Sequence, residues 1–256
     1  MKRAPLLWHL VRQDLLTRYA GSVLGTLWLF ANPLAQILIF TLVFGNLIGP
    51  RIGNGQSPHA YGFYLMAGVL PWTAFSTTVS RTAMAFLDKA GIIGKVSVGL
   101  RTIVVHYALA ESVVLTLILS LLIAVMAALG RPPGWEFLWL PLLVVFQQGI
   151  GFAIGLAGAI LTVFVRDIKE VIGIVMMVWM WMTPIVYSIA DVNAVLRDLQ
   201  RANPAYWFVA PYQKVFVSGG SPDLVPLAAE AAGVAMVIAF LLWLLGRYER
   251  DIRDLL

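Results

Sequence analysis

The sequence predicts an all-α membrane protein with six transmembrane helices, on the basis of its composition and the length of its apolar runs. Of 256 residues, 60% are hydrophobic and 12% are charged, about half the charged share of an ordinary soluble domain. A soluble chain of this size needs charges to cover its surface, so we expect lipid to cover most of this one. The apolar runs are also continuous and too long for barrel strands of about 10 alternating residues. We predict one transmembrane domain over residues 1–256.

Six apolar segments between charged residues are long enough to cross a bilayer core about 30 Å thick, which requires roughly 20 helical residues. They are residues 24–47, 61–80, 103–129, 137–163, 171–189 and 226–246. With the N-terminus inside, 13 of the 18 lysines and arginines are cytoplasmic. Basic residues mark the cytoplasmic side, so we predict a multi-pass plasma-membrane protein with both termini in the cytoplasm. The net charge of +5 then reports orientation and not nucleic-acid binding.

Residues 5–19 predict an amphipathic helix that lies in the cytoplasmic interface. Leu7, Val11 and Leu15 share one helical face, while Arg12 lies elsewhere. This pattern is typical of helices in the plane of a membrane surface. The apolar stripe is imperfect, so a frayed N-terminus is the alternative.

Residues 81–101 form a cytoplasmic connection that is long enough for a short helix at 83–90, ended by Gly91. The stretch "GIIGKVS" invites comparison with a phosphate-binding loop, which requires G-x-x-x-x-G-K-[ST]. Lys89 stands where the first glycine belongs, and Val96 stands where Ser or Thr belongs. We therefore expect this segment to contact another protein and not to bind ATP; a solvated loop is the alternative.

Residues 190–225 form a long external connection. Within it, "NPAYWFVAPY" at 203–212 is aromatic and apolar but too short to cross a bilayer. A re-entrant or interfacial helical hairpin fits, because irregular backbone near a membrane is sheltered by protein or faces water. An aromatic anchor resting among lipid headgroups is the alternative.

The residues offer little catalytic chemistry. The chain has no cysteine, which excludes thiol catalysis, disulfides and cysteine-based metal sites. Its three histidines, His9, His59 and His106, lie on different segments, without the spacing of a known metal motif. We expect no catalytic residue, no metal site and no enzyme activity in this chain.

Glu111 lies deep in the third predicted span, eight residues beyond Ile103, or about 12 Å along a helix. An ionisable group at this depth indicates either a functional site or a structural bond to a neighbouring helix. Both interpretations stay open at the level of sequence.

The fifth predicted span contains the aromatic stretch "VWMWMTPIVY" at 178–187. Trp and Tyr combine a flat apolar face with a polar edge, so Trp179, Trp181 and Tyr187 are suited to stack on the C–H faces of sugars. Ordinary packing against lipid and helices explains them equally well.

The chain resembles a known family in four stretches. Residues 18–33 carry the pattern R-Y-x-x-S-x-L-G-x-L-W-x-x-x-N-P, and the others are "YLMAGVLPWTAFS" at 64–76, "VRDIKEVIGIVMMVWMWMTPIVY" at 165–187 and "NPAYWFVAPYQKVFVSGGSPD" at 203–223. In this order they resemble the membrane subunits of polysaccharide ABC exporters of the type-2 ABC export family, which include O-antigen (Wzm-type), capsule and teichoic-acid permeases. In the last stretch, "WFVAPY" replaces the more aliphatic run that is usual in the family.

The resemblance implies a permease subunit that pairs with a second copy of itself and recruits two ATP-binding cassette subunits. ATP and Mg²⁺ are then bound by those subunits, and this chain carries no cofactor. The implied cargo is a lipid-linked polysaccharide, which crosses the bacterial inner membrane through a channel at the homodimer interface. The first and fifth spans are expected to line that channel with Trp28, Asn32, Phe40, Trp179, Trp181 and Tyr187.

The resemblance also gives roles to the connections. The interface helix at 5–19 and the cytoplasmic connection at 81–101, the coupling segment, are expected to lie against the ATPases. The external hairpin at 190–225 is expected to be the outer gate. The implied ATPase contacts are Arg12, Asp88, Lys89, Lys95, Arg166 and Asp167. The implied gate residues are Tyr206, Trp207, Phe208 and Tyr212.

Two questions stay open at this point. Asn32 and Pro33 fit a kink that faces a hydrated polymer path, and they equally fit a bend required for packing. At the level of function, a type-2 ABC exporter of a drug or small lipid and an ion-gradient-driven carrier remain alternatives. Glu111 is the residue on which such a carrier would depend.

Overall fold

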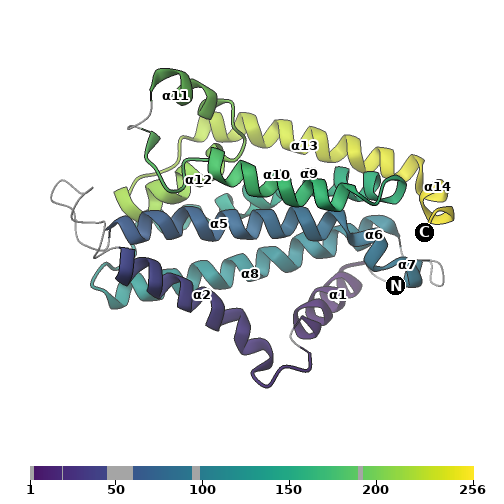
Figure 1. Cartoon of the computed structure of the whole chain (residues 1–256), viewed down its shortest axis with the longest axis horizontal. Helices are drawn as coiled ribbons and strands as arrows, with labels where there is room; N and C mark the ends of the chain where they lie inside the picture. Colours follow the sequence, from purple (N-terminus) through teal and green to yellow (C-terminus); the bar gives the residue numbers. More distant parts are fainter. Residues whose placement is uncertain (1–2, 19, 45–59, 94–98, 190–192) are drawn as a thin grey trace.

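The computed structural model describes residues 3–18, 20–44, 60–93, 99–189 and 193–256, and every regular element in these ranges is helical. The long helices lie side by side, and α1 crosses them obliquely (Figure 1). The α-helices are α1 (Arg3–Thr17), α2 (Trp28–Leu38), α5 (Ala60–Ala83), α6 (Ala85–Asp88), α7 (Ala90–Ile93), α8 (Leu100–Ala128), α9 (Leu140–Phe164), α10 (Ile168–Met182), α11 (Ala194–Arg201), α12 (Tyr206–Gln213), α13 (Leu224–Arg247) and α14 (Glu249–Asp254). Shorter segments are the 3-10 helices η1 (Gly25–Leu27) and η3 (Trp135–Trp139) and the π-helices η2 (Ile39–Phe44) and η5 (Lys214–Ser218). The predicted all-α class is confirmed for the described residues.

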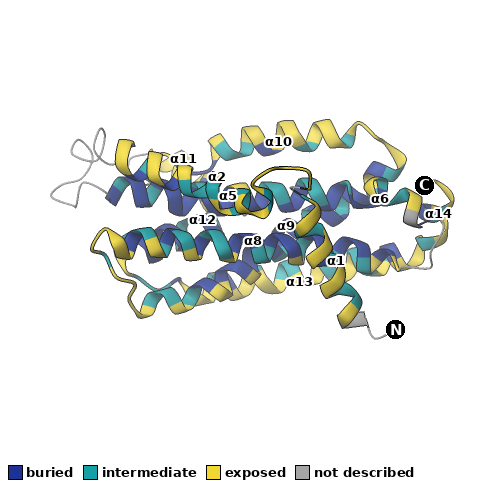
Figure 2. Ribbon diagram, turned by 90° about the horizontal axis from the view of Figure 1, so that it is seen from below, coloured by how far each residue is buried: buried dark blue, intermediate teal, exposed yellow. Residues whose placement is uncertain are grey.

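Helix α5 is the centre of the bundle. It packs against α8, α9, α10 and α12 and against η2, and its Phe63, Met66 and Phe75 are fully buried. Helix α13 lies at the periphery and exposes apolar side chains such as Met236 and Phe240 (Figure 2). An apolar helix that is exposed over its length suits a lipid environment.

Glycines on α9 allow α5 and α9 to approach closely. Gly151 and Gly155 lie four residues apart, in the small-x-x-x-small spacing typical of packed membrane helices. A Cβ on Gly155 would lie 2.6 Å from the Thr82 Cβ and 3.0 Å from the Val79 carbonyl oxygen. These separations leave no room for a side chain, so the contact requires glycine.

Two buried hydrogen bonds fix the register of the same helix pair. Near one end, Gln147 Nε2 donates to the carbonyl oxygen of Pro71 at 2.9 Å. Near the other, Thr162 Oγ1 donates to the carbonyl oxygen of Ala83 at 2.8 Å. Buried polar groups are costly when unpaired, so a slip of α9 along α5 would be unfavourable.

Four helical segments of the described chain are long and apolar enough to cross a membrane, namely Gly25–Val43, Leu100–Ala128, Trp135–Phe164 and Leu224–Arg247. They coincide with the predicted first, third, fourth and sixth spans. Helix α5 also has 24 residues. It is not among these four segments, because Thr and Ser side chains make its C-terminal half more polar. Helix α10 has 15 residues, about 22 Å at 1.5 Å per residue, and ends before the predicted 189 because Pro184 disfavours helical backbone at Thr183.

The connection after α5 differs in detail from the sequence prediction. One helix was expected at 83–90, ended by Gly91, but α5 runs to Ala83 and the backbone leaves helical values at Lys89. Two short helices, α6 and α7, result, and Gly91 lies inside α7. In the segment 190–225, α11 and α12 form two short helices in succession. The start of α1 and helix α14 lie toward the same end of the bundle (Figure 1).

Gly155→Ala is expected to lower the stability of the detergent-purified protein by about 1–3 kcal/mol, the usual cost of overpacking. The matched control is Gly233→Ala on α13, where a Cβ meets nothing within 4 Å. Both changes raise helix propensity equally. Thermal unfolding followed by tryptophan fluorescence should give the lower Tm for G155A, and equal Tm values would contradict the close α5–α9 contact.

Candidate functional site

The described residues of the pattern at 18–33 make up the connection between α1 and α2, including η1, and the first part of α2. Gly21 and Gly25 have φ values of +85° and +49°, a left-handed conformation that favours glycine. Across this connection, Trp28 Nε1 donates a hydrogen bond to Ser22 Oγ at 2.9 Å. The spacing of Ser, Gly and Trp in the pattern therefore follows from the geometry of the connection.

Four charged residues form a network beside this connection, which we call the four-charge cluster. Arg81 Nη2 lies 2.6 Å from Asp14 Oδ1, and Arg81 Nη1 lies 2.7 Å from Glu111 Oε1. Arg18 Nη2 also pairs with Glu111 Oε1 and lies 3.2 Å from Asp14 Oδ2. The Arg81 guanidinium also lies 4.9 Å from the ring centroid of Tyr107. Two positive and two negative charges make the cluster neutral.

The cluster joins three elements that are distant in the sequence. Asp14 and Arg18 come from α1 and the turn after it, Arg81 from the end of α5, and Glu111 from α8, where it is 1% exposed. A buried charge is tolerated only when it is paired and hydrogen-bonded. Glu111 is therefore bonded to groups on neighbouring elements, which is the structural alternative that the sequence left open.

The arginines also determine the protonation of Asp14. Burial raises the pKa of Asp14, but hydrogen bonds and positive charge from Arg81, then Arg18, outweigh it and lower the pKa below its ordinary value. A carboxyl with a lowered folded-state pKa stabilises the fold above its unfolded pKa of about 3.9. The contribution of Asp14 is thus complete at neutral pH and is lost only as the pH falls through its folded pKa.

The predicted ATPase contacts gather mostly at one end of the bundle. Asp88 ends α6 and Lys89 follows it, while Arg166 and Asp167 form the turn between α9 and α10. Lys89 is half-buried, and the other three are exposed. The hydrogen bond from α9 to the last residue of α5 places that turn beside α6. Charged side chains from two connections are therefore available on one surface.

The other two predicted ATPase contacts, Arg12 and Lys95, do not belong to this group of four. Arg12 is exposed on α1, which is remote in the sequence from the turn between α9 and α10. Lys95 lies outside the described residues. The C-terminal helix α14 joins the same end, because Arg253 Nη1 donates to the carbonyl oxygen of Ile93 in α7 at 3.1 Å.

The predicted channel residues lie on α2 and η2, on α10 and in the segment after α10, and these three helices pack against α5. On α2 and its continuation η2, Asn32 is exposed, whereas Trp28 and Phe40 are half-buried. Trp181 on α10 is 65% exposed. Tyr187 is half-buried, and its hydroxyl donates to the carbonyl oxygen of Met182 at 3.0 Å.

Trp179 belongs to a hydrogen-bonded cluster at the end of α10. Its Nε1 donates to Asn203 Oδ1 at 2.7 Å. Asn203 Nδ2 donates to Gln200 Oε1 at 3.1 Å and to Thr183 Oγ1 at 3.3 Å, and Gln200 Nε2 donates to the Met182 carbonyl oxygen at 2.5 Å. These bonds fasten the end of α10 to the α11–α12 segment. The indole ring also meets Phe75 edge-on, with centroids 5.6 Å apart.

The predicted gate residues divide into two pairs. Phe208 and Tyr212 are fully buried, and the Phe208 ring lies 5.0 Å from the ring of Phe75 on α5. Tyr206 and Trp207 are half-buried and line a hollow of about 140 Å³. The second pair is the one that faces accessible space.

Sequence reasoning did not identify Asp14, Arg81 or Asn203 as site residues. A signal for the first two was present, because the deep carboxylate of Glu111 requires a cationic partner. Which arginine supplies it depends on how α1, α5 and α8 meet, and that information is not local. Asn203 lay inside a recognised stretch, but nothing in the stretch indicates that its amide reaches Trp179.

Arg81→Ala is expected to destabilise the purified protein by about 3 kcal/mol, the lower end for breaking a buried ion pair, since the Arg81 side chain is 27% exposed. The substitution leaves two carboxylates with one arginine between them. The control Arg201→Ala breaks a pair with Asp198 whose side chains are 67% and 72% exposed, and should cost under about 1 kcal/mol. Thermal unfolding in detergent compares the two; a Tm for R81A at or above that of R201A would show that the cluster does not hold the fold.

The chain is similar to known transporter proteins over most of its length. The family model described as "ABC-2 type transporter" matches residues 5–217. The chain is 30% identical over 240 residues to the O-antigen export system permease protein RfbA of Myxococcus xanthus, covering 93% of this chain and 88% of the relative. It is also 25% and 24% identical to two proteins of the same name from Klebsiella pneumoniae, over 94% and 84% of this chain and 89% and 81% of theirs.

The match extends over most of the chain and includes the α1–α2 connection, the four-charge cluster and the end of α10. In transporters of this kind the membrane subunit is not an enzyme, and ATP hydrolysis belongs to a separate subunit. The chain belongs to the ABC-2 type transporter family, as a membrane permease subunit.

Proposed function

We propose that this chain is the permease subunit of an ATP-driven exporter that moves a lipid-linked, O-antigen-like polysaccharide across the bacterial inner membrane. The observation that carries the proposal is the likeness, over 93% of the chain, to a protein named as an O-antigen export permease. The pattern at residues 18–33, whose described part connects α1 to α2 beside the four-charge cluster, supports it.

The proposed topology has six crossings, with α5 and α10 added to the four apolar segments. Helix α10 is short, but the irregular segment 183–187 extends it and is covered by α5. Tyr61 Oη donates to the Val186 carbonyl oxygen at 3.1 Å, and Tyr64 Oη donates to that of Tyr187 at 2.9 Å. Irregular backbone at membrane depth is tolerated where protein satisfies its polar groups. The distribution of basic residues supports a cytoplasmic location for both termini.

A second copy of the chain is proposed to cover α2 and α10. Ile174 and Met177 lie about one helical turn apart on α10 and are 60% and 61% exposed. An apolar stripe of this kind suits packing against a partner helix. In the dimer, the exposed parts of α2 and α10 would line the channel, with Asn32 offering hydrogen bonds and Trp181 a flat apolar face to the polymer.

Two ATP-binding cassette subunits are proposed to dock at the end formed by α6, α7 and the α9–α10 turn. Asp88, Arg166 and Asp167 are exposed there. Helix α5 runs directly into α6, and the four-charge cluster joins α5 to α1 and α8. A displacement at the docking end would therefore reach α1 and α8 through paired charges. ATP and Mg²⁺ are expected on the partner subunits.

Deletion and complementation in the source bacterium test the proposed function. Surface polysaccharide should be lost on deletion and should return only when this chain and its ATPase partner are both present. Affinity purification at native levels should recover an ATP-binding cassette protein. Unchanged surface glycan would favour export of a drug or small lipid. Transport that continues without the ATPase and stops when the proton gradient is collapsed would favour an ion-gradient carrier.

Trp181→Ala is expected to reduce polysaccharide export severalfold without lowering Tm, because this exposed ring loses its stacking on sugar but little packing. Trp135→Ala is the matched control, since Trp135 is 64% exposed in η3 and lies outside the proposed channel. Surface polymer per copy of folded permease is the measurement. Equal export by the two variants would remove Trp181 from the polymer path.

A further inference from the structure

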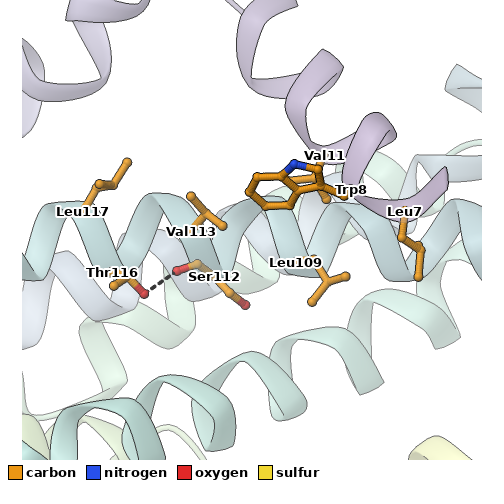
Figure 3. Close-up of a pocket in the computed structure, with 8 residues that line it drawn as sticks. All are labelled: Leu7, Trp8, Val11, Leu109, Ser112, Val113, Thr116 and Leu117. Carbon is orange, nitrogen blue, oxygen red and sulfur yellow. Dashed lines mark hydrogen bonds between the residues drawn. The ribbon is translucent and has the colours of Figure 1, made fainter. Parts of the chain in front are cut away.

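A groove between α1 and α8 lies outside every site considered so far. Its volume is about 510 Å³, and it is lined by Leu7, Trp8 and Val11 of α1 and by five residues within 109–117 of α8. Figure 3 shows the Trp8 ring projecting from α1 over the α8 stripe. The stripe recurs at helical spacing, so one face of α8 forms the floor of the groove.

The walls of the groove are apolar in effect, although they contain two hydroxyl groups. Ser112 Oγ donates to the carbonyl oxygen of Ala108, and Thr116 Oγ1 donates to that of Ser112, both at 2.8 Å (Figure 3 draws the second bond). Neither hydroxyl is left as a donor to a bound molecule. Water in a cavity needs two to four polar partners, so these walls favour a hydrocarbon occupant.

The volume of the groove is large enough for a long hydrocarbon chain. Its volume corresponds to about 17 water molecules at ~30 Å³ each, and a methylene group is similar in size to water. A linear hydrocarbon of many methylene groups therefore fits between the two helices.

The surface beside the groove carries the positive charge of Arg12. Arg12 is exposed on α1 and, with His9 and Gln13, borders a separate shallow hollow. The one acidic residue of α1, Asp14, is already paired with two arginines. Cationic side chains at a membrane surface attract anionic headgroups, so the charge favours a lipid with a negative head.

We propose that the groove binds an acyl chain of an anionic phospholipid from the cytoplasmic leaflet, with Arg12 beside the phosphate. The assignment rests on the proposed placement of α1 at the cytoplasmic surface. Trp8 is 64% exposed, as expected of a tryptophan at headgroup level. The lipid fills the space beside α1 and supports the helix next to the four-charge cluster.

Photolabelling of the intact exporter complex tests the site. The complex is placed in phosphatidylcholine vesicles that contain phosphatidylglycerol with a diazirine on its acyl chain, and is illuminated without ATP. Labels are expected on the α1 peptide and on residues 109–117. Val113→Trp fills the groove and should remove most of this labelling, whereas Val237→Trp, at a position 49% exposed on α13, should leave it unchanged. Leu109→Trp at the groove rim is the second filling variant if V113W does not fold.

The headgroup assignment is tested with Arg12→Gln. This change should reduce the preference for tagged phosphatidylglycerol over tagged phosphatidylcholine about fivefold, the factor that one cationic residue near an anionic surface contributes. Labelling that survives both filling variants would overturn the site. Equal labelling by the two lipids in the wild type would overturn the anionic assignment, and preferential labelling by a tagged isoprenyl phosphate would give the groove to the cargo's lipid carrier instead.

Because labelling is measured without ATP, its outcome is separable from that of the proposed function. If the wild-type complex shows groove labelling but exports no polysaccharide, the exporter assignment alone is refuted. Export with no groove labelling would refute the lipid site alone.

Discussion

The four-charge cluster is the constraint on which the position of α1 depends. An unpaired carboxylate at the depth of Glu111 is unfavourable by several kcal/mol, and Arg18 and Arg81 remove that cost only if α1, α5 and α8 meet at one point. The pairs to Asp14 add the same requirement from the other side. Because all four charges are satisfied together, α1 cannot shift along α8 without leaving at least one buried charge without its partner.

Helix α5 extends the influence of this constraint along the whole bundle. At one end Arg81 belongs to the cluster, and at the other Tyr61 and Tyr64 hold the backbone after α10. Between them, glycines of α9 bring the two helices into close contact, so α5 has little freedom to bend or slide. In the proposed exporter, one packed helix therefore contacts the ATPase end, the channel helices and the gate segment.

The sequence predicted those features that depend on local pattern. Continuous apolar runs located α8, α9 and α13 within a few residues, since such runs form helices wherever lipid or protein covers them. The end of α10 was missed, although Pro184 gives a local reason for it, because hydropathy alone does not register a backbone break. The pairing of Asp14 with Arg81 spans 67 residues and follows only from the packing of helices, which no local pattern contains.

The two tryptophans of α10 show why residue type alone does not define a role. Trp179 and Trp181 stand two residues apart, on different helical faces, and the sequence treats them alike. Trp181 is exposed, whereas the indole nitrogen of Trp179 is bonded to Asn203 and its ring packs on α5. In the proposed channel, Trp181 is free to meet the polymer directly, while Trp179 meets it with its hydrogen bond already used. Movement of the α11–α12 segment away from α10 must break that bond and the bond from Gln200 to Met182, so the proposed channel wall and the proposed outer gate are joined through the side-chain amides of Asn203 and Gln200.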